Sequence, residues 1–565
     1  CFACCCISFA SAGNPPFFPT DVVANAKGEL LMTDKGVKRV DVFSPDGKTL
    51  LRSFPMDETP TGILLDGDKA YVTTFGTTGH LQILSLESGR VEASIPTGSG
   101  ACHPMFGPDK KHIYVCNQFQ TTISEIDPVA RTVKVLREPK SAVFSKDGKY
   151  MFVTNFLPAQ RADLDYVAAC VSVIEMDGFT KVKDIQLANG SNALRGICIT
   201  PDGKYIYVSH NLGRFTVPTS QLQQGWMNTS AFSVIDVDKQ EFLGAIVVDE
   251  PERGAAGIWS IACNDESVFI SHSGTHEVSV IDHKAMLEKF LNYPNKAVLD
   301  YDLTFLYGLR ERIPLEGNGP RNMILNGDKL IIPTYFADIL NIMDINTNEV
   351  TSVELNPGRE ETAENKGERY FNDASHCFQN WQSCNGCHPG DARTDGMNWD
   401  LMNDGVGNSK NCKSMLFSHM TPPNMISGIR EHAERAVRAG FNFIQFFEVS
   451  EEDAACVDAY LKSLRPVPSP YLVNGELSDL AKEGQKVFEK LKCGECHSGV
   501  YYTDMKYHRI GEDIEFEKGW DTPTLREVWR TAPYLFDGRA ATMKEVFSVH
   551  KHGIEKKVSE KDIEA

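Results

Sequence analysis

The sequence has no apolar run long enough to cross a membrane and no excess of positive charge. A membrane-spanning helix needs about 20 consecutive apolar residues. The 57 lysines and arginines are outnumbered by 76 aspartates and glutamates, giving a net charge of −19 that would repel a phosphate backbone. We therefore expect no transmembrane segment and no nucleic-acid partner.

The composition also lacks the bias of disordered or fibrous chains. Hydrophobic residues make up 42% of the sequence and charged residues 24%, values typical of folded globular proteins. A chain of 565 residues is too long for one ordinary core, so we expect several domains.

The first residues have the character of an export signal. Residues 1–12 form a short apolar run ending in Ala10-Ser11-Ala12, the small-residue pattern of a signal-peptidase site before Gly13. No initiator Met or charged segment precedes this run, and Val558 to Ala565 stop within a helix-like pattern, so we expect both ends to be incomplete. A buried N-terminal helix is the alternative for residues 1–12. The prediction is an exported protein, periplasmic or in the cell envelope.

Repeats with a period near 40 residues fill the region from 13 to 357. Turn signals such as Asp147-Gly148 and Asp202-Gly203 each precede a short strand-like run, and a second strand-like run follows each of these. Seven such pairs predict a seven-bladed β-propeller. The first runs include Tyr71-Val72-Thr73-Thr74, Phe152-Val153-Thr154-Asn155 and Tyr207-Val208-Ser209-His210. Residues 17–356 thus resemble the bacterial propeller repeats named for a Tyr-Val-Thr-Asn tetrapeptide.

After Pro357 the pattern changes from strands to helices. Residues 429–439 and 451–464 have helical periodicity, and the Pro-rich stretch 465–470 divides the region in two. Two mainly α-helical domains are predicted, at 358–470 and 471–565. The charged stretch 358–367 predicts an exposed connector to the propeller.

Both helical domains contain a Cys-x-x-Cys-His motif, the spacing for covalent attachment of a c-type haem. Two thiols one helical turn apart add to the two vinyl groups, and the adjacent histidine then binds the iron. A zinc site or a redox dithiol is the alternative, but zinc would require further ligands. The motifs predict two covalent haems, bound by Cys384, Cys387 and His388 and by Cys493, Cys496 and His497.

Of the 16 cysteines, four lie in residues 1–12 and four in these motifs. Sequence alone does not pair the others, of which several lie in strand-like runs and are expected to be small buried hydrophobic residues. They are Cys102, Cys116, Cys170, Cys198, Cys263, Cys377, Cys412 and Cys456.

The segments 521–526 (DTPTLR) and 532–543 (APYLFDGRAATM) resemble the C-terminal half of the bacterial di-haem cytochrome c peroxidases and of the related enzyme that matures methylamine dehydrogenase. Residues 413–430 hold a degenerate copy. The resemblance implies a peroxidatic haem in the first domain and an electron-transfer haem in the second. It also implies His550 as the sixth iron ligand of the second haem, with His552 and His508 as competitors.

The same resemblance leaves the first haem without an evident sixth ligand. Phe441, at the position that we equate with His550, cannot bind iron. We expect an open or weakly closed site with His419, Met402, Met420 and His432 as candidate ligands. The candidate catalytic residues are His419, His432, Gln445 and Glu448. The family also binds Ca²⁺ between its haem domains, but no acidic cluster in this sequence identifies such a site.

Within the propeller, His210 and His272 end corresponding strands, which leaves a metal site on one mouth as an alternative. The insertion from Leu212 to Asn228, which includes Trp226, is our candidate for a haem-domain interface or a specificity element.

Three functions remain open at this point. The first is a cytochrome c peroxidase-like oxidoreductase that uses peroxide, with electrons supplied by a small redox protein or a quinol-linked donor. The second is an electron-transfer cytochrome whose propeller docks partners. The third is a propeller-based dehydrogenase with the haems as acceptors.

Overall fold

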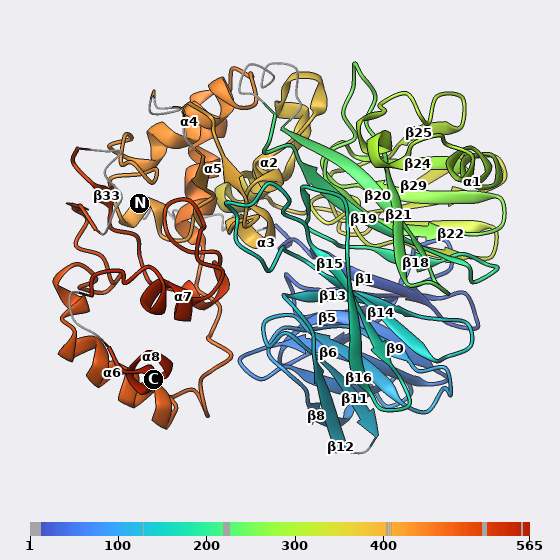
Figure 1. Cartoon of the computed structure of the whole chain (residues 1–565). Helices are drawn as coiled ribbons and strands as arrows, with labels where there is room; N and C mark the ends of the chain where they lie inside the picture. The colour runs from blue at the N-terminus through green and yellow to red at the C-terminus, as the bar shows by residue number, and fades with distance from the viewer. Residues whose placement is uncertain are drawn as a thin grey trace, which may run out of the picture.

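The structure, a computed structural model, describes residues 13–127, 129–217, 227–402, 405, 407, 409–510, 517–554 and 558–565. The predicted signal segment at residues 1–12 lies outside this range. Figure 1 shows two parts, a ring of β-sheets in blue to yellow-green and beside it, in yellow to red, a helical part whose short helices are joined by long irregular segments. Residues 358–565 are therefore less helical than the sequence predicts. No helix of the described residues is long and apolar enough to span a membrane.

The ring is a seven-bladed β-propeller, as the repeats predict, and each blade is an antiparallel meander. Blade 1 holds β1 (Pro19–Ala24), β2 (Leu30–Asp34), β3 (Arg39–Phe43) and β4 (Leu50–Pro55). Blade 2 holds β5 (Thr59–Asp66), β6 (Lys69–Phe75), β7 (His80–Ser85) and β8 (Val91–Pro96). Blade 3 holds β9 (Ala101–Phe106), β10 (Ile113–Asn117), β11 (Thr122–Asp127) and β12 (Val129–Lys134). Blade 4 holds β13 (Pro139–Phe144), β14 (Tyr150–Asn155), β15 (Cys170–Glu175) and β16 (Thr180–Gln186).

Blade 5 has five strands, because β17 and β18 both pair with β19. Its strands are β17 (Ser191–Asn192), β18 (Ile197–Ile199), β19 (Tyr205–Gly213), β20 (Asn228–Asp236) and β21 (Glu241–Val247). Blade 6 holds β22 (Ile258–Cys263), β23 (Ser267–His272), β24 (Glu277–Asp282) and β25 (Arg310–Pro314), with α1 (His283–Leu291) between the last two. Blade 7 holds β26 (Ile324–Asn326), β27 (Lys329–Pro333), β28 (Ile339–Asp344) and β29 (Val350–Glu354).

Burial along one blade explains why the repeats are recognisable in the sequence. Every residue of β2 is buried, whereas β4 at the outer edge buries only Phe54. Neighbouring blades cover both faces of the inner strands, so these strands are rich in apolar and β-branched residues. The outer strand faces solvent and carries no such constraint.

The ring closes between its first and last blades by side-chain packing and one buried carboxylate. Val22 and Met32 of blade 1 share a core with Ile331 and Leu340 of blade 7. The backbone N–H of Phe17 donates to the Asp338 carboxylate at 2.9 Å, which joins the start of the chain to the last blade.

The helical part has its own core. The helices are α2 (Ala363–Asn372), α3 (Pro389–Ala392), α4 (Ala433–Phe443), α5 (Glu451–Ser463), α6 (Asp479–Lys490), α7 (Met543–Ser548) and α8 (Glu560–Glu564). α2 packs along α5, and Phe371, Phe441 and Leu461 lie in the apolar cluster between these helices and α4. α5 forms where its periodicity predicts it. α4 begins at Ala433, later than predicted, because Asn424 and Arg430 pair in an isolated bridge just before it.

The connector from the propeller is largely exposed, as its charge predicts, but its second half is helical. Residue Arg359 pairs with Asn14 in a parallel bridge, and α2 begins directly afterwards at Ala363. Thr362 caps this helix, and Gly367 is buried against α5. The charge of the connector thus correctly indicates an exposed segment, but it does not indicate that part of this segment is a helix packed against α5.

Candidate functional site

The first Cys-x-x-Cys-His motif lies on a short 3-10 helix at the edge of the helical core. Cys384 begins this helix, Cys387 follows it, and His388 comes next. Nδ1 of His388 lies 3.0 Å from the carbonyl oxygen of Arg393. Because a carbonyl only accepts, Nδ1 must carry the proton, which leaves Nε2 with a lone pair for a metal. Burial lowers the pKa of His388 and so favours this neutral form.

The second motif repeats this arrangement. Cys493 begins a 3-10 helix, and Nδ1 of His497 lies 3.3 Å from the carbonyl oxygen of Tyr502. Both histidines therefore donate to the carbonyl five residues further along the chain. Burial also lowers the pKa of His497. Each motif presents one neutral imidazole nitrogen beside two thiols, the donor set that a c-type haem requires.

The scaffold around the two motifs is also duplicated. After each motif comes a two-stranded ladder, then a 3-10 turn, then a helix. The 3-10 turns at Ser418–Met420 and Val528–Arg530, and the starts of α4 and α7, are both 110 positions apart. The ladders pair β30 (Asn398–Trp399) with β31 (Lys410–Asn411) and β32 (Tyr507–His508) with β33 (Trp520–Asp521). The degenerate copy seen in the sequence is thus a structural repeat.

A cavity of about 200 Å³, open to solvent on one side, adjoins the first motif. Cys387 and His388 lie in its wall, together with Ala436 and Val437 of α4 and with Thr522 from the second repeat. Its lining is mainly apolar. Besides the motif residues, side chains with sulfur in the lining are Met402, Cys412, Met415 and Met425, and His388 is the only histidine among the described lining residues. A mainly apolar cavity beside an imidazole nitrogen is a suitable place for one face of a macrocycle.

The predicted ligands of the first haem lie mostly elsewhere. His419 is buried with Nε2 bonded to the Asp458 carboxylate at 2.9 Å, so a neighbouring helix already holds its ring. The side chain of His432 is 60% exposed. Met420 is exposed, and only Met402 of the four candidates lines the cavity.

Of the other predicted catalytic residues, one is exposed and one is buried beside the first motif. Glu448 is not buried in the core. Gln445 is buried, and its Nε2 lies 3.1 Å from the Cys384 sulfur, while no hydrogen-bond partner of its Oε1 is found among the described residues. Gln445 therefore contacts an attachment thiol and is absent from the described cavity lining.

Two contacts with residues of the first motif were not predicted from the sequence. Asn228, at the start of β20, places Nδ2 3.3 Å from the Cys387 sulfur. The sulfur of Cys412 lies 3.5 Å from Nδ1 of His388. Nothing in the sequence singled out Cys412 among the other cysteines.

The insertion that the sequence marked as an interface does contact the helical part through its described end. Asn228 closes this insertion, and Met227 before it contacts Gln382. Residues 218–226, with Trp226, lie outside the described residues.

At the second motif, the ring of His552 lies beside that of His497. The ring centroids of these two residues are 6.3 Å apart. His508 is bonded through Nε2 to Asp504 at 2.8 Å. His550 follows the end of α7, and no ring contact between it and His497 is found in the described part of the chain.

The starts of α4 and α7 are 110 positions apart, so the repeat matches His550 with Gly440 and not with Phe441. α4 continues to Phe443, and Phe441 is buried in the core, whereas α7 ends at Ser548 before His550 is reached. The two repeats differ after this point because α4 is longer than α7.

A buried network of ion pairs links the first motif to the propeller. Arg393, whose carbonyl holds His388, donates through Nε to Glu527 at 2.7 Å. Arg530, next to Glu527 in space, donates to the propeller residue Glu138 at 3.0 Å, and both partners are almost fully buried. Each charge in this network faces an opposite charge, as buried ions require.

Alternative metal sites receive no support. Among the described residues no group of three or more His, Cys, Asp and Glu side chains converges to hold a metal ion, so neither zinc nor Ca²⁺ has a visible site. Burial raises the pKa of the Cys384 thiol to about 12, which disfavours the thiolate that zinc or a reactive dithiol would require.

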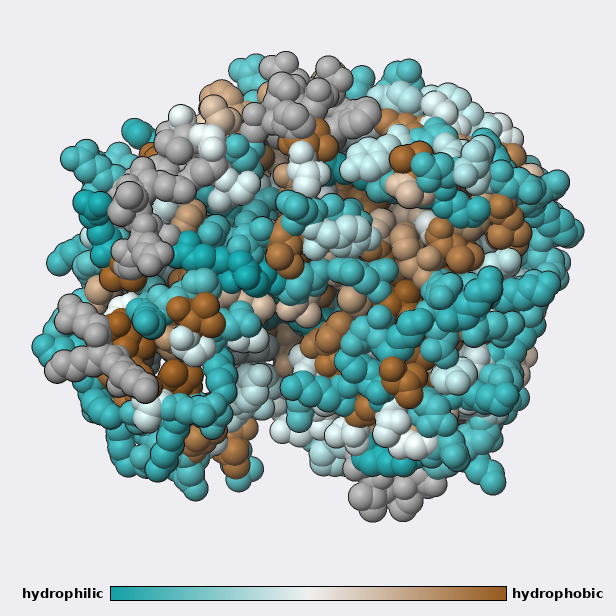
Figure 2. Space-filling view, viewed as in Figure 1, coloured by the Kyte–Doolittle hydropathy of each residue, from teal (hydrophilic) through white to brown (hydrophobic). Residues whose placement is uncertain are grey.

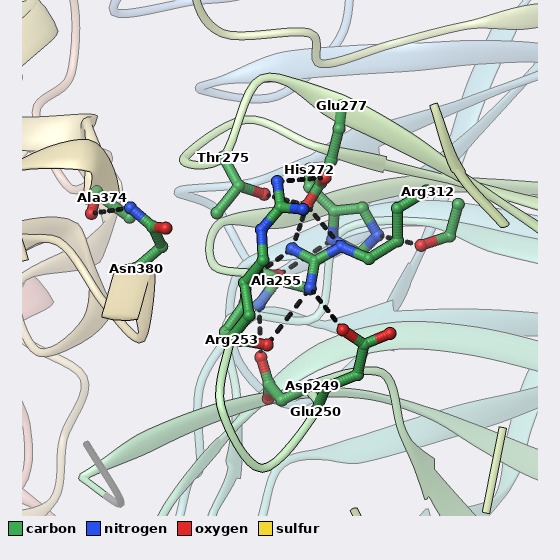
Figure 3. Close-up of polar contacts among 12 residues, drawn as sticks. Asp249, Glu250, Arg253, Ala255, His272, Thr275, Glu277, Arg312, Ala374 and Asn380 are labelled. Atoms are coloured by element: carbon green, nitrogen blue, oxygen red, sulfur yellow. Dashed lines mark hydrogen bonds and ion pairs between the residues drawn. The ribbon is translucent and has the colours of Figure 1, made fainter. Parts of the chain in front are cut away.

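The propeller histidines are satisfied core residues. In Figure 3, His272 lies within the side-chain network of blade 6, bonded through Nδ1 to the Ala255 carbonyl and through Nε2 to Ser279. His210 is held in the same manner by Asn211 and Ser233. With both ring nitrogens engaged, neither histidine offers a lone pair to copper.

No family model matches the chain. Hydrazine synthase subunit gamma of Kuenenia stuttgartiensis is 28% identical over 32% of this chain and 68% of that protein. Hydrazine synthase subunit beta of the same organism is 24% identical over 26% of this chain, and the match spans only 39% of that subunit. A solved structure of Kuenenia stuttgartiensis hydrazine synthase covers 62% of this chain and 98% of its own with a TM-score of 0.52 and 19% identity, a likeness of fold. The chain thus contains a seven-bladed β-propeller that resembles hydrazine synthase subunits.

Proposed function

We propose that this protein is an exported di-haem c-type cytochrome with oxidoreductase activity, of the cytochrome c peroxidase type. The observation that carries the proposal is the duplicated proximal geometry, in which His388 and His497 each follow two thiols and each donate Nδ1–H to the carbonyl five residues later. Similarity to subunits named for hydrazine synthase supports redox chemistry.

The residues present fit two haems. Apolar walls and His388 border the cavity at the first motif. Around the second motif, Leu480, Val500 and Val549 are each at least 60% exposed, and α6 buries none of its residues. Figure 2 shows hydrophobic residues gathered around a hollow in the C-terminal part, at the lower left. Apolar surface of this kind fits the face of a macrocycle.

When bound, each haem supplies an iron that exchanges electrons and binds small ligands. The residues around each haem then determine which molecules can approach it. At the first site, His388 is oriented by Arg393, and no second histidine lies in the described cavity lining, so a small molecule such as peroxide can approach the far side. At the second, exposed site an electron donor such as a small redox protein can dock.

The first prediction concerns haem content. Pyridine haemochrome analysis should find two haems that acid-acetone does not extract. Cys493→Ala should impair attachment of the second haem and spare the first, since the two sites lie in separate repeats. Cys456→Ala, at a buried cysteine of α5 outside both motifs, is the matched control and should retain both. A haem-free or single-haem protein contradicts the proposal.

An electron-transfer cytochrome is the second candidate, favoured by the thioethers of Met402, Met415 and Met425 in the cavity lining. A thioether bound to the first iron would close it to peroxide. Cyanide titration separates the two functions, because a peroxidase-type site binds about one cyanide per two haems and a closed site binds none.

A further inference from the structure

We propose that the mouth of the propeller's central channel, where the guanidinium groups of Arg195 and Arg321 lie over the indole ring of Trp259, binds a small oxyanion such as phosphate. Guanidinium groups recognise such anions by paired hydrogen bonds to two oxygen atoms. The site does not involve the haems, so the inference goes beyond the proposed function.

These side chains occupy equivalent positions in neighbouring blades. Trp259 is the second residue of β22, and Arg195 and Arg321 lie shortly before β18 and β26. Lys140, the second residue of β13, has the same position in blade 4. The backbone carbonyls of Arg195, Trp259 and Arg321 each accept a hydrogen bond from a serine of the preceding blade, and these serines are Ser141, Ser209 and Ser271. Because the innermost strands of a propeller surround its central channel, the four residues lie next to one another at its mouth.

Neither arginine forms an ion pair in the described part of the chain. Arg195 is 8% exposed, and its Nη1 donates to the carbonyl oxygens of Ala193 and Ile258, at 3.4 and 3.3 Å. Nε of Arg321 is buried and has no hydrogen-bond partner among the described residues. Burial and the charge of Arg321 lower the pKa of Arg195 to about 9. An oxyanion beside the indole ring would supply the opposite charge that a buried cation requires.

Two lysines add positive charge at the same mouth. Nζ of Lys35 donates to the hydroxyl of Tyr335 at 3.2 Å, and the guanidinium of Arg321 lies 3.7 Å from the centre of the same tyrosine ring. Nζ of Lys140 donates to a glutamine side chain at 2.7 Å. Each lysine is therefore held by an uncharged group. The carboxylate of Glu138, which also lies near Lys140, already forms an ion pair of the buried network.

Two carboxylates of the helical part face these four cations. Glu368 of α2 lies near Lys35 and Arg321, and Asp391, just after the first motif, lies near Lys35 and Lys140. Four positive charges thus face two negative ones, and this excess favours a dianion such as phosphate or sulfate. Lys35 and Asp391 are exposed, so an anion can reach the mouth from solvent.

The test measures the binding of inorganic phosphate to the full-length holoprotein by isothermal titration calorimetry, with sodium chloride holding the ionic strength constant. Arg321→Met keeps an apolar side chain over Trp259 and removes the guanidinium, so its phosphate affinity should be about tenfold weaker than that of the wild type. Arg321→Lys, which retains the charge, should recover part of the affinity. Arg52→Met is the matched control, because Arg52 pairs with Glu29 at the outer edge of blade 1, and it should bind phosphate like the wild type.

Lys35→Met provides a second variant at an exposed residue, where misfolding is not expected, and it should also weaken phosphate binding. Equal phosphate affinity in Arg321→Met, Lys35→Met and Arg52→Met would overturn the inference. A wild-type protein that binds neither phosphate nor sulfate would overturn it as well.

Absorption spectra of the haems, recorded during the same titration, should stay unchanged. A phosphate response that alters these spectra equally in all variants would place the anion at an iron and contradict the channel site. Haem content decides the proposed function and does not enter this comparison, so the two proposals can fail separately.

Discussion

At the scale of the residue, the surroundings of each histidine decide its chemistry. His388 and His497 donate one ring nitrogen to a backbone carbonyl and keep the other for a ligand. His272 has both ring nitrogens engaged in the core, and burial lowers its pKa to about 3. Nε2 of His419 is hydrogen-bonded to the Asp458 carboxylate. The contacts of His272 and His419 are made by tertiary packing, so sequence alone identifies a ligand histidine only next to a Cys-x-x-Cys pair.

Asp249, at the lower edge of the network in Figure 3, predicts a dependence of stability on pH. Its carboxylate accepts from the backbone N–H groups of Ser230 and Ala255 at 2.6 Å each, yet burial raises its pKa from 3.8 to about 6. Between about pH 4 and pH 6 the unfolded chain loses this proton while the folded chain keeps it. The free energy of unfolding should therefore fall with rising pH in this window, by about 3 kcal/mol in total.

Urea denaturation across this window tests the effect. Asp249→Asn cannot titrate, so its stability relative to the wild type should rise with pH up to about pH 6 and then stay level. Asp147→Asn is the control. The pKa of Asp147, in an exposed turn, is lowered to about 2 by the Ser145 side chain and the Lys149 backbone, so its effect is confined to more acidic conditions. Equal pH slopes in Asp249→Asn and the wild type would contradict the assignment.

At the scale of the element, the helices of the helical part differ in how closely they approach their neighbours. α2 and α5 approach so closely that a Cβ on Gly367 would lie 1.9 Å from the carbonyl oxygen of Cys456. In α4, by contrast, a Cβ on Gly440 would meet nothing within 4 Å. The helical periodicity of α5 was visible in the sequence. The close contact between α2 and α5 was not visible in the sequence, because the many charged residues of α2 gave no sign that Gly367 is buried.

This contrast predicts opposite effects for two identical substitutions. Gly367→Ala should separate α2 from α5 and lower the free energy of unfolding by about 1–3 kcal/mol, as overpacking does. Gly440→Ala should raise stability by up to about 1 kcal/mol, because alanine favours a helix over glycine where there is space. Thermal denaturation of both holoproteins measures the two shifts. A melting temperature for Gly367→Ala at or above that of the wild type would contradict the packing.

At the scale of the whole molecule, the propeller and the helical part are joined by buried charges as well as apolar contacts. Arg530 pairs with Glu138 of the propeller, and its guanidinium also lies over the ring of Phe119. Asp391, three residues after His388, faces Lys35 and Lys140 of the propeller. These cations, with Arg530 and Arg393, lower the pKa of the exposed Asp391 carboxyl to about 2. The propeller is therefore electrostatically complementary to the loop that follows the first motif.

Breaking the buried pair should loosen this docking. Arg530→Met leaves Glu138 and Glu527 without their shared cation, and an uncompensated buried charge costs about 3–5 kcal/mol. Limited proteolysis should then cleave between the propeller and the second repeat faster than in the wild type. Arg526→Met, at an arginine of the same segment that lies outside the buried pair, should leave the cleavage rate unchanged. Equal rates in both variants would show that this pair does not secure the interface.

Local sequence was sufficient to predict the propeller and to locate both Cys-x-x-Cys-His motifs. These features are local or periodic: each blade repeats one turn-and-strand pattern, and each motif needs only the spacing of three residues. Which side chains meet those motifs depended instead on tertiary packing. Asn228 contacts Cys387 from a propeller hairpin, Cys412 lies beside His388, and the ring of His552 lies beside that of His497. Such contacts join residues distant in the chain, and their geometry is set by how the repeats pack rather than by any local pattern.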